Sequence, residues 1–361
     1  MSFEDAPVPL LVGAVVAALV TGVVRWLALR RGVVDEPDPS RRLHTAPVPR
    51  LGGVGIAAGL AAALLAAWGL VPEPEDWLLA AARGTLSRVA MVLAAAFAVG
   101  LVDDLRPRGK GLPAWTKLVA QAGVGALAVF VARARFDGTP WGPWGELPLG
   151  GAAEVLTVLW FVAVLNVVNF MDGSDAIVAA MAVVILAAAG GEHPAAAAGT
   201  LLPAAAAAFG FLAWNAPPAK IFMGDGGSHL LGAAIAIAPC AVPAPGGQVV
   251  VPGAPWVLVG AALLPSIVDV AEALLHKVRH RIPMSQAHHD HLYQRLVKAT
   301  GSHGAVALRY GLLTLAAVLV VGPLAQAAGV PVACAVGAAV LAVHLADGHR
   351  RTRGVKRLGG T

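Results

Sequence analysis

Three short acidic motifs in this chain could do chemistry, because each lies where a long apolar run meets polar sequence. They are Val102-Asp103-Asp104-Leu105, Asn169-Phe170-Met171-Asp172-Gly173-Ser174-Asp175 and Phe222-Met223-Gly224-Asp225-Gly226-Gly227-Ser228. A charged side chain in or against hydrocarbon costs about 2.5 kcal/mol or more, so it normally faces a polar cavity. Carboxylates from three distant segments therefore predict one pocket that holds a cation.

The first motif places two carboxylates side by side, Asp103 and Asp104. Adjacent carboxylates repel each other unless a cation or a guanidinium lies between them, and hard divalent cations prefer such oxygen ligands. A Mg²⁺ site, or a contact to a Mg²⁺-bound phosphate, is one interpretation. A solvated loop start with ion pairs is the other.

The second motif continues a polar helix face, because Asn166, Asn169 and Asp172 follow one another at a spacing of three. Helix capping would account for one Asp at a tight turn. It does not account for two Asn with both Asp172 and Asp175 at hydrocarbon depth. We therefore expect these side chains to bind a polar ligand.

The third motif predicts a glycine-rich turn that opens a helix, with Ser228 as its cap. Such a turn can present backbone N–H groups to a phosphate. Because Asp225 would repel bare phosphate, a metal between them resolves the conflict. An ordinary interhelical turn is the alternative.

Two basic segments add candidates for anion binding. The histidines of the last polar loop, His288, His289 and His291, could bind zinc, but imidazoles that donate to a diphosphate fit better, with Arg295 adding charge. A solvated basic loop stays open as the plain alternative. Near the N-terminus the run Arg41-Arg42-Leu43-His44 could bind a lipid phosphate or be ordinary basic flanking sequence. Asp269, inside an apolar run, has no partner visible in the sequence.

Composition places these motifs in a membrane. The 361 residues are 58% hydrophobic and 13% charged, with a mean hydropathy of +0.74, which is far too apolar for a soluble domain of this length. We predict an all-α integral membrane protein with one polytopic domain over residues 1–361. A span needs about 20 residues. The ten or eleven transmembrane helices are expected near 8–29, 51–71, 84–101, 113–132, 151–169, 176–190, 194–213, 228–243, 254–275, 305–323 and 328–346.

The charge distribution orients these spans. With the N-terminus outside, the cytoplasmic segments hold nineteen of the 26 Lys and Arg residues, as the positive-inside rule requires. Those segments are 30–50, 102–112, 170–175, 214–227, 276–304 and 347–361. The C-terminus is then cytoplasmic, and the positive-inside rule accounts for its basic tail without a nucleic-acid partner. All three acidic motifs face the cytoplasm.

That one-sided placement favours an enzyme that works from the cytoplasm. A transporter would also place charge near the midplane and would show repeated halves, and no internal repeat is visible. Two alternatives stay open. A non-catalytic transporter would move its substrate without releasing a nucleotide, and a membrane phosphatase would release free phosphate.

Taken together, the motifs resemble those of the polyprenyl-phosphate N-acetylhexosamine-1-phosphate transferases, glycosyltransferase family 4. The resemblance runs from about Asp35 to Leu296 and is closest to the branch that initiates O-antigen-type glycans on undecaprenyl phosphate. It rests on Arg-x-Leu-His…Pro-x-Pro-Arg-x-Gly-Gly, Asp-Asp, Asn-Phe-Met-Asp-Gly-x-Asp, Pro-Ala-Lys-Ile-Phe-Met-Gly-Asp-x-Gly-Ser and Ala-His-x-x-His-Leu-Tyr-Gln-Arg-Leu. The chain departs from the family pattern at Ala176, where glycine is usual, at Ser174 and at His289.

The resemblance implies a reaction: transfer of a sugar 1-phosphate from a UDP-N-acetylhexosamine, GlcNAc or a 6-deoxy relative, to undecaprenyl phosphate, with release of UMP. It implies Mg²⁺, with Mn²⁺ as a substitute, and a bacterial inner (plasma) membrane enzyme in a lipid environment, for which a homodimer stays open. Phospho-N-acetylmuramoyl-pentapeptide transferase activity is the alternative within the family. The implied catalytic residues are Asp103, Asp104 and Asp225, with Asp225 and Asp104 at the metal. The implied substrate-binding residues are Asn166, Asn169, Asp172, Asp175, Lys220, His288, His291, Arg295 and His44.

Overall fold

The described part of the protein is a bundle of helices with three two-residue antiparallel ladders in the connections. The computed structural model describes residues 7–35, 47–70, 77–106, 111–136, 139–140, 146–147, 149–192, 195–240, 242–243, 249–250, 255–283 and 291–355. The first eight helices are α1 (Pro7–Arg30), α2 (Gly53–Leu70), α3 (Trp77–Asp104), α4 (Ala114–Phe130), α5 (Ala152–Met171), α6 (Ile177–Glu192), α7 (Ala195–Asn215) and α8 (Gly224–Ile237). They are followed by α9 (Pro255–Arg279), α10 (Leu292–Thr300), α11 (His303–Ala316), the π-helical segment η2 (Ala317–Val321), α12 (Gly322–Ala328) and α13 (Val330–Arg351). The ladders pair β1 (Val34–Asp35) with β2 (Val48–Pro49), β3 (Thr139–Pro140) with β4 (Glu146–Leu147), and β5 (Val242–Pro243) with β6 (Val249–Val250).

The prediction of an all-α membrane protein is confirmed. Each of the eleven predicted spans overlaps at least one helix, and the span predicted at 305–323 covers most of α11, all of η2 and the start of α12. Within the described ranges, six helices are long and apolar enough to cross a bilayer by themselves: Pro7–Arg30, Gly84–Asp104, Ala152–Met171, Val257–Arg279, His303–Ala325 and Val330–Arg351. Crossing by all eleven segments, and the sidedness of the termini, stay predictions.

Two helix ends differ from the sequence prediction in a way that affects the acidic motifs. Helix α3 continues through Asp104 and α5 through Met171. Asp103 and Asp104 therefore belong to the last turn of a helix, not to a loop that begins at residue 102. In the sequence, the Asp103-Asp104 pair predicts the end of the apolar helix before it. In the structure, contacts with α8 keep these residues in the last helical turn of α3.

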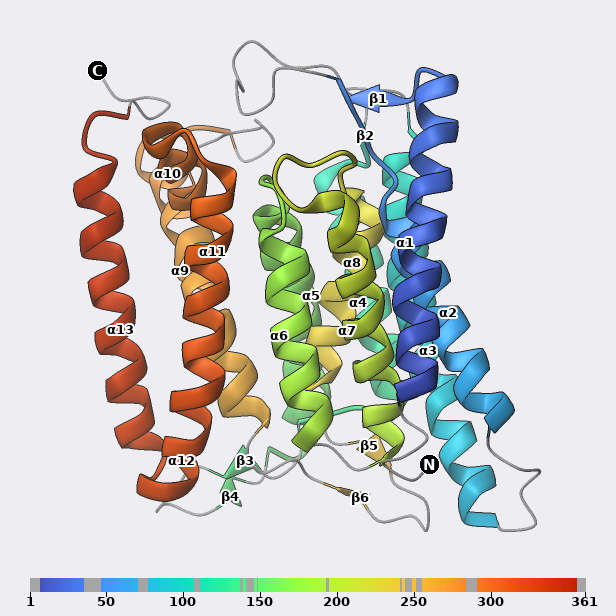
Figure 1. Ribbon diagram of the computed structural model, residues 1–361. Helices are drawn as coiled ribbons and strands as arrows, with labels where there is room; N and C mark the ends of the chain where they lie inside the picture. The colour runs from blue at the N-terminus through green and yellow to red at the C-terminus, as the bar shows by residue number, and fades with distance from the viewer. Residues whose placement is uncertain are drawn as a thin grey trace.

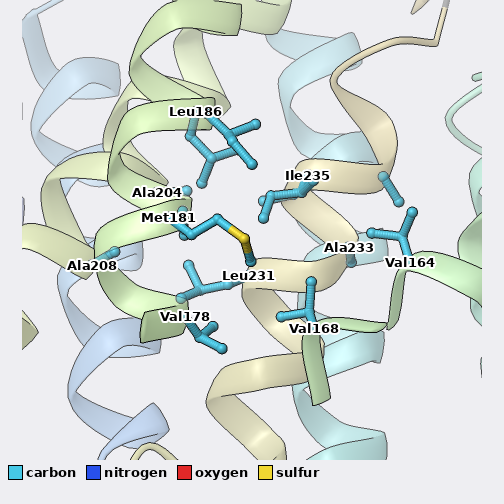
Figure 2. Close-up of a cluster of buried hydrophobic side chains, with 14 of the residues drawn as sticks. Val164, Val168, Val178, Met181, Leu186, Ala204, Ala208, Leu231, Ala233 and Ile235 are labelled. Atoms are coloured by element: carbon cyan, nitrogen blue, oxygen red, sulfur yellow. The ribbon is translucent and has the colours of Figure 1, made fainter. Parts of the chain in front are cut away.

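Helix α8 is the centre of the bundle. All its side chains from Gly226 to Ile237 are buried, and it contacts α2, α3, α5, α6 and α7. Figure 2 shows Leu231 and Ile235 of α8 among Met181 of α6, Ala208 of α7 and Val168 of α5. A helix that is enclosed on all sides has little freedom to shift, so its N-terminal residue is held in a fixed position.

Small residues let α1 and α2 approach closely. A Cβ on Gly59 would lie 2.5 Å from the carbonyl oxygen of Gly13, and one on Gly55 would lie within contact of Thr21. Glycine and other small residues at a spacing of four are the usual way for membrane helices to pack backbone to backbone. The outer face of α1 is instead apolar and exposed at Leu11, Val15 and Leu19, as expected of a lipid-facing surface.

The helices run between two ends of the bundle (Figure 1). The β1–β2 ladder, the start of α8 and helix α10 lie at the upper end, whereas the other two ladders and α12 lie at the lower end. Helix α1 begins at the lower end and α13 finishes at the upper one. The upper end therefore gathers the segments that carry the acidic motifs.

Candidate functional site

The N-terminus of α8 is bound by a carboxylate from α3. Asp104 accepts the backbone N–H of Asp225 on Oδ1 at 2.9 Å and that of Gly226 on Oδ2 at 2.8 Å. These are two of the amides that a helix start leaves without an internal partner. The expectation that Ser228 caps α8 is therefore wrong: its hydroxyl donates to the carbonyl of Asp225 at 3.2 Å, and Asp104 supplies the cap from another helix.

Asp225 itself receives hydrogen bonds from two further helices. Asn169 of α5 donates to its Oδ1 at 2.9 Å and also to Ser228 Oγ at 3.0 Å. Lys117 of α4 donates to its Oδ2 at 2.5 Å. The structure therefore brings all three acidic motifs together, as the sequence predicted, around one carboxylate.

Lys117 also binds the first aspartate of the Asp-Asp pair. Its ammonium lies 3.2 Å from Oδ2 of Asp103, whose Oδ1 accepts the backbone N–H of Leu112 at 2.5 Å. The two neighbouring aspartates thus point to different partners, Asp104 to α8 and Asp103 to α4. The cation that separates the carboxylates of Asp103 and Asp225 in the structure is a lysine.

Asp172 adds a further negative group in the turn after α5. Burial raises the pKa of Asp172 well above its usual range, and the nearby carboxylates of Asp225 and Asp104 raise it further. Four carboxylates, from Asp103, Asp104, Asp172 and Asp225, thus lie beside two cationic side chains, Lys117 and Arg50, so ionisation of all four would leave excess negative charge at the site.

That excess fits a divalent cation shared with a substrate. No group of three His, Cys, Asp or Glu side chains that could hold a metal is present in the described ranges. Mg²⁺ is commonly bound by one or two carboxylates together with substrate phosphates and water. Asp225, whose hydrogen-bond donors are the side chains of Asn169 and Lys117, and Asp172 match that requirement. Both oxygens of Asp104, which the family resemblance places at the metal, are instead bound by backbone amides of α8.

Asn166 and Asp175 hold protein segments. Asn166 donates to Oε1 of Gln121 at 2.6 Å and to the carbonyl of Val162 at 2.7 Å. Asp175 accepts the backbone N–H of Ala219 at 2.8 Å on Oδ2, which ties the turn after α5 to the loop before α8. Both were expected to bind substrate, and the contacts observed are structural.

The loop before α8 is held on its other side by the segment before α2. Phe222 donates its N–H to the carbonyl of Pro49 at 2.8 Å, and Gly52 and Gly53 donate to the carbonyls of Phe222 and Met223. Arg50 donates to the backbone carbonyl of Asp104 at 3.2 Å. The Pro-x-Pro-Arg-x-Gly-Gly motif therefore packs directly beside the acidic site.

Lys220 lies on the outer side of that loop. It is exposed, and its ammonium lies 5.7 Å from the centre of the Trp214 ring. The guanidinium of Arg25 lies at the same distance from that ring and donates from Nε to the carbonyl of Lys220 at 3.1 Å. No contact in the described part of the chain joins Lys220 to the acidic group.

Asp269, whose role the sequence left open, anchors the start of α10. The buried carboxylate accepts the backbone N–H groups of Leu292 at 2.8 Å and Tyr293 at 3.0 Å, and the hydroxyl of Tyr310 at 2.6 Å. His291 lies at 3.2 Å through Nδ1. The hydroxyl of Tyr293 in turn donates to the carbonyl of Phe170 at 2.9 Å, so α10 is fixed against the Asn-Phe-Met-Asp turn.

Four predicted residues remain: one is buried elsewhere, one lies beside the site turn, and two lie outside the described residues. Arg295 is buried and pairs with Glu272 at 2.9 Å and with Thr352 at 3.1 Å, so its observed role is to join α9, α10 and the end of α13. His44 and His288 lie in segments that the structure does not describe. His291 lies beside the site turn, with its ring 6.0 Å from that of Phe170.

Sequence reasoning missed Lys117, Gln121 and His229, all of which lie in or beside the site. Lys117 was counted as part of an apolar span. A signal was available, since a lysine inside such a span and a glutamine one turn later share a helix face, and buried charge in a membrane helix is a functional hypothesis by default.

Comparisons with known proteins agree with this arrangement. A family model described as glycosyl transferase family 4 matches residues 86–242, a range that contains all three acidic motifs. Decaprenyl-phosphate N-acetylglucosaminephosphotransferase of Mycobacterium tuberculosis is 30% identical, with 85% of this chain and 81% of the relative covered.

Two further relatives extend the comparison. Probable undecaprenyl-phosphate N-acetylglucosaminyl 1-phosphate transferase of Bacillus subtilis is 29% identical, with 82% of this chain and 78% of the relative covered. Phospho-N-acetylmuramoyl-pentapeptide-transferase of Levilactobacillus brevis is 30% identical over a smaller share, 63% of this chain and 73% of the relative. With its acidic motifs assembled around one carboxylate and relatives matched over most of their length, this chain belongs to glycosyl transferase family 4, as a membrane phosphotransferase.

Proposed function

We propose that this protein transfers a sugar 1-phosphate from a UDP-N-acetylhexosamine to undecaprenyl phosphate and releases UMP. The observation that carries the proposal is the meeting of Asp225, Asn169 and Lys117 from three helices at the end of the bundle. The names of the Bacillus and Mycobacterium relatives specify N-acetylglucosamine and a polyprenyl phosphate. We propose GlcNAc, or a 6-deoxy relative, as the sugar and the cytoplasmic face of the inner membrane as the location.

The chemistry that such a site must supply is positioning and charge neutralisation, because phosphoryl transfer needs little covalent help from the protein. A Mg²⁺ ion held by Asp225 and Asp172 would neutralise the donor diphosphate and stabilise the departing UMP. Lys117 places a second positive charge beside the same carboxylate. Asn169 keeps Asp225 oriented, and Asp104 keeps the helix start that carries Asp225 in place.

Asp103 is proposed as an orienting group and not as a general base. A lipid phosphate monoester has a second pKa of about 6 and is already anionic at neutral pH, so its oxygen needs no deprotonation. Both oxygens of Asp103 also have hydrogen-bond donors, Leu112 and Lys117. Asp103→Asn should therefore lower turnover at every pH, and a loss fully rescued at high pH would contradict the orienting role.

The function is tested with purified protein, undecaprenyl phosphate, Mg²⁺ and a panel of UDP-sugars. UMP and the lipid-linked diphosphate sugar are measured by mass spectrometry. We expect UMP with UDP-GlcNAc or a 6-deoxy relative and no turnover after chelation with EDTA, restored by Mg²⁺ and less well by Mn²⁺. No UMP from any sugar would contradict the proposal, and turnover with UDP-N-acetylmuramoyl-pentapeptide alone would identify the alternative activity.

A further inference from the structure

Below the acidic site lies a second set of polar side chains from the same three helices. The outer layer consists of Lys117, Asp225 and Asn169. One helical turn deeper on α4 and α8, and three residues earlier on α5, lie Gln121, His229 and Asn166, which form the inner layer. Residues three or four apart share a helix face, so the two layers are stacked.

The hydrogen bonds of the inner layer form one directed chain. Nδ1 of His229 lies 2.8 Å from the carbonyl oxygen of Asp225, and because a carbonyl only accepts, Nδ1 carries the proton. Nε2 of the neutral ring then accepts from Nε2 of Gln121 at 3.1 Å. Oε1 of Gln121 accepts from Asn166 at 2.6 Å. The chain of hydrogen bonds therefore runs from Asn166 through Gln121 and His229 to the backbone of Asp225.

Two of the three side chains of the inner layer are sealed from solvent, whereas Asn166 is partly exposed. Gln121 and His229 are both 0% exposed. A buried polar group that loses its partner costs about 1–3 kcal/mol, so rotating α4 against α8 would break the Gln121–His229 contact at a substantial cost. The inner layer therefore fixes the rotation of α4 at the turn that carries Lys117.

We propose that Gln121 and His229 are positioning residues that hold Lys117 between Asp103 and Asp225. The expected effect on kcat rests on the proposed function. The position of Lys117 does not, because it follows from the hydrogen bonds that join α4, α5 and α8. Gln121 acts through Lys117, and His229 acts through both Gln121 and the backbone of Asp225.

The first test is kinetic. Gln121→Met keeps an unbranched side chain of similar length but removes both hydrogen bonds. We expect kcat to fall about tenfold or more, since small misplacements in an active site can cost that much, while KM for both substrates stays within about twofold. In a Lys117→Met background the same change should cause no further loss, because the residue through which Gln121 acts is gone.

The control is Thr314→Val, which removes a buried hydroxyl hydrogen bond to the carbonyl of Tyr310 on α11. It should lower thermal stability to a similar degree without lowering kcat. Equal losses of kcat in Gln121→Met and Thr314→Val would overturn the positioning role. So would a double variant of Gln121→Met and Lys117→Met whose kcat falls by the product of the two single losses. If Gln121→Met fails to fold, His229→Phe breaks the same contact from the other side and carries the same expectations.

A second readout does not need turnover. Acylation of the lysines by an N-hydroxysuccinimide ester, followed by peptide mass spectrometry, reports how well Lys117 is held by its carboxylates. Gln121→Met should raise the acylation rate of Lys117 severalfold, and Thr314→Val should not. An unchanged acylation rate of Lys117 in Gln121→Met would overturn the positioning role even if the enzyme is active. If acylation rises as expected but the wild type releases no UMP, the proposed function alone is overturned.

Discussion

Lys117 holds the two carboxylates of Asp103 and Asp225 together with a single ammonium group. Without that charge the carboxylates would repel each other and the donor diphosphate would meet uncompensated negative charge. We expect Lys117→Met to lower the rate of UMP release about 100-fold or more, as is typical when a preorganised electrostatic group is removed. The matched control is Lys298→Met on the exposed side of α10, which should retain wild-type turnover, and equal activity of the two variants would contradict this role for Lys117.

Ala176 adopts a backbone conformation that favours glycine. Its φ is 62°, and the left-handed region costs a non-glycine residue about 1–2 kcal/mol. This is the position at which the family resemblance leads us to expect glycine. Its N–H donates to Asn215 Oδ1 at 2.9 Å, so the strained turn is held in place by the last residue of α7.

Ala176→Gly should therefore stabilise the protein, by about 1 kcal/mol after allowance for the larger conformational freedom of glycine in the unfolded chain. The measurement is thermal unfolding in detergent. Ala180→Gly, one turn into α6, is the control and should destabilise by about 1 kcal/mol, since glycine is unfavourable inside a helix. A lower unfolding temperature for both variants would show that the turn at Ala176 is not strained.

At the residue scale the sequence identified the right carboxylates but not all of their partners. Asp225, Asn169 and the Asp-Asp pair were predicted from charge beside apolar sequence, and they do meet. Asp175 and Arg295 were expected to bind substrate, but they pair with the protein itself. A polar residue next to hydrocarbon needs a partner, and sequence alone does not show whether that partner is a ligand or another helix.

At the scale of the elements, the site depends on how closely α3 approaches the start of α8. A Cβ on Gly100 of α3 would lie 2.1 Å from the carbonyl oxygen of Asp225. That contact is with backbone, which cannot move aside as a flexible side chain would. Gly100 therefore sets the distance at which Asp104, one turn later, reaches the amides of α8.

Gly100→Ala should push the two helices apart, destabilise the protein by about 1–3 kcal/mol as overpacking does, and abolish most of the turnover. Gly84→Ala in the same helix is the matched control, because no atom lies within 4 Å of the position its Cβ would take. That variant should be as stable as the wild type or more so by up to about 1 kcal/mol. Thermal unfolding and UMP release measure both effects, and equal behaviour of the two alanine variants would refute the close approach.

The location of each helix was largely predictable, whereas its ends and neighbours were not. Apolar runs identified the long helical segments because a helix that can cross a bilayer needs about 20 mostly apolar residues. The extension of α3 through Asp104 was not predicted, since it depends on contacts with α8. The buried centre was not predicted either, because α8 is one of the shorter helices and begins with polar residues.

For the whole molecule, the structure separates an upper end that carries the acidic site from a lower end that carries the β3–β4 ladder (Figure 1). The distribution of Lys and Arg predicts that the upper end is cytoplasmic. Two exposed positions report on this arrangement: Gly151, just before α5 at the lower end, and Ala299, in α10 at the upper end.

Single cysteines at these positions can be labelled with a membrane-impermeant maleimide after Cys334, which is exposed, and Cys240, which is buried, have been replaced by alanine. In right-side-out spheroplasts we expect Gly151→Cys to be labelled and Ala299→Cys to be protected, with the reverse in inverted vesicles. Because Gly151 and Ala299 are separated by the full length of the bundle, labelling of both from one side would contradict a transmembrane arrangement of α5. The opposite pattern would place the site outside the cell, where UDP-sugars are not supplied, and would contradict the proposed reaction.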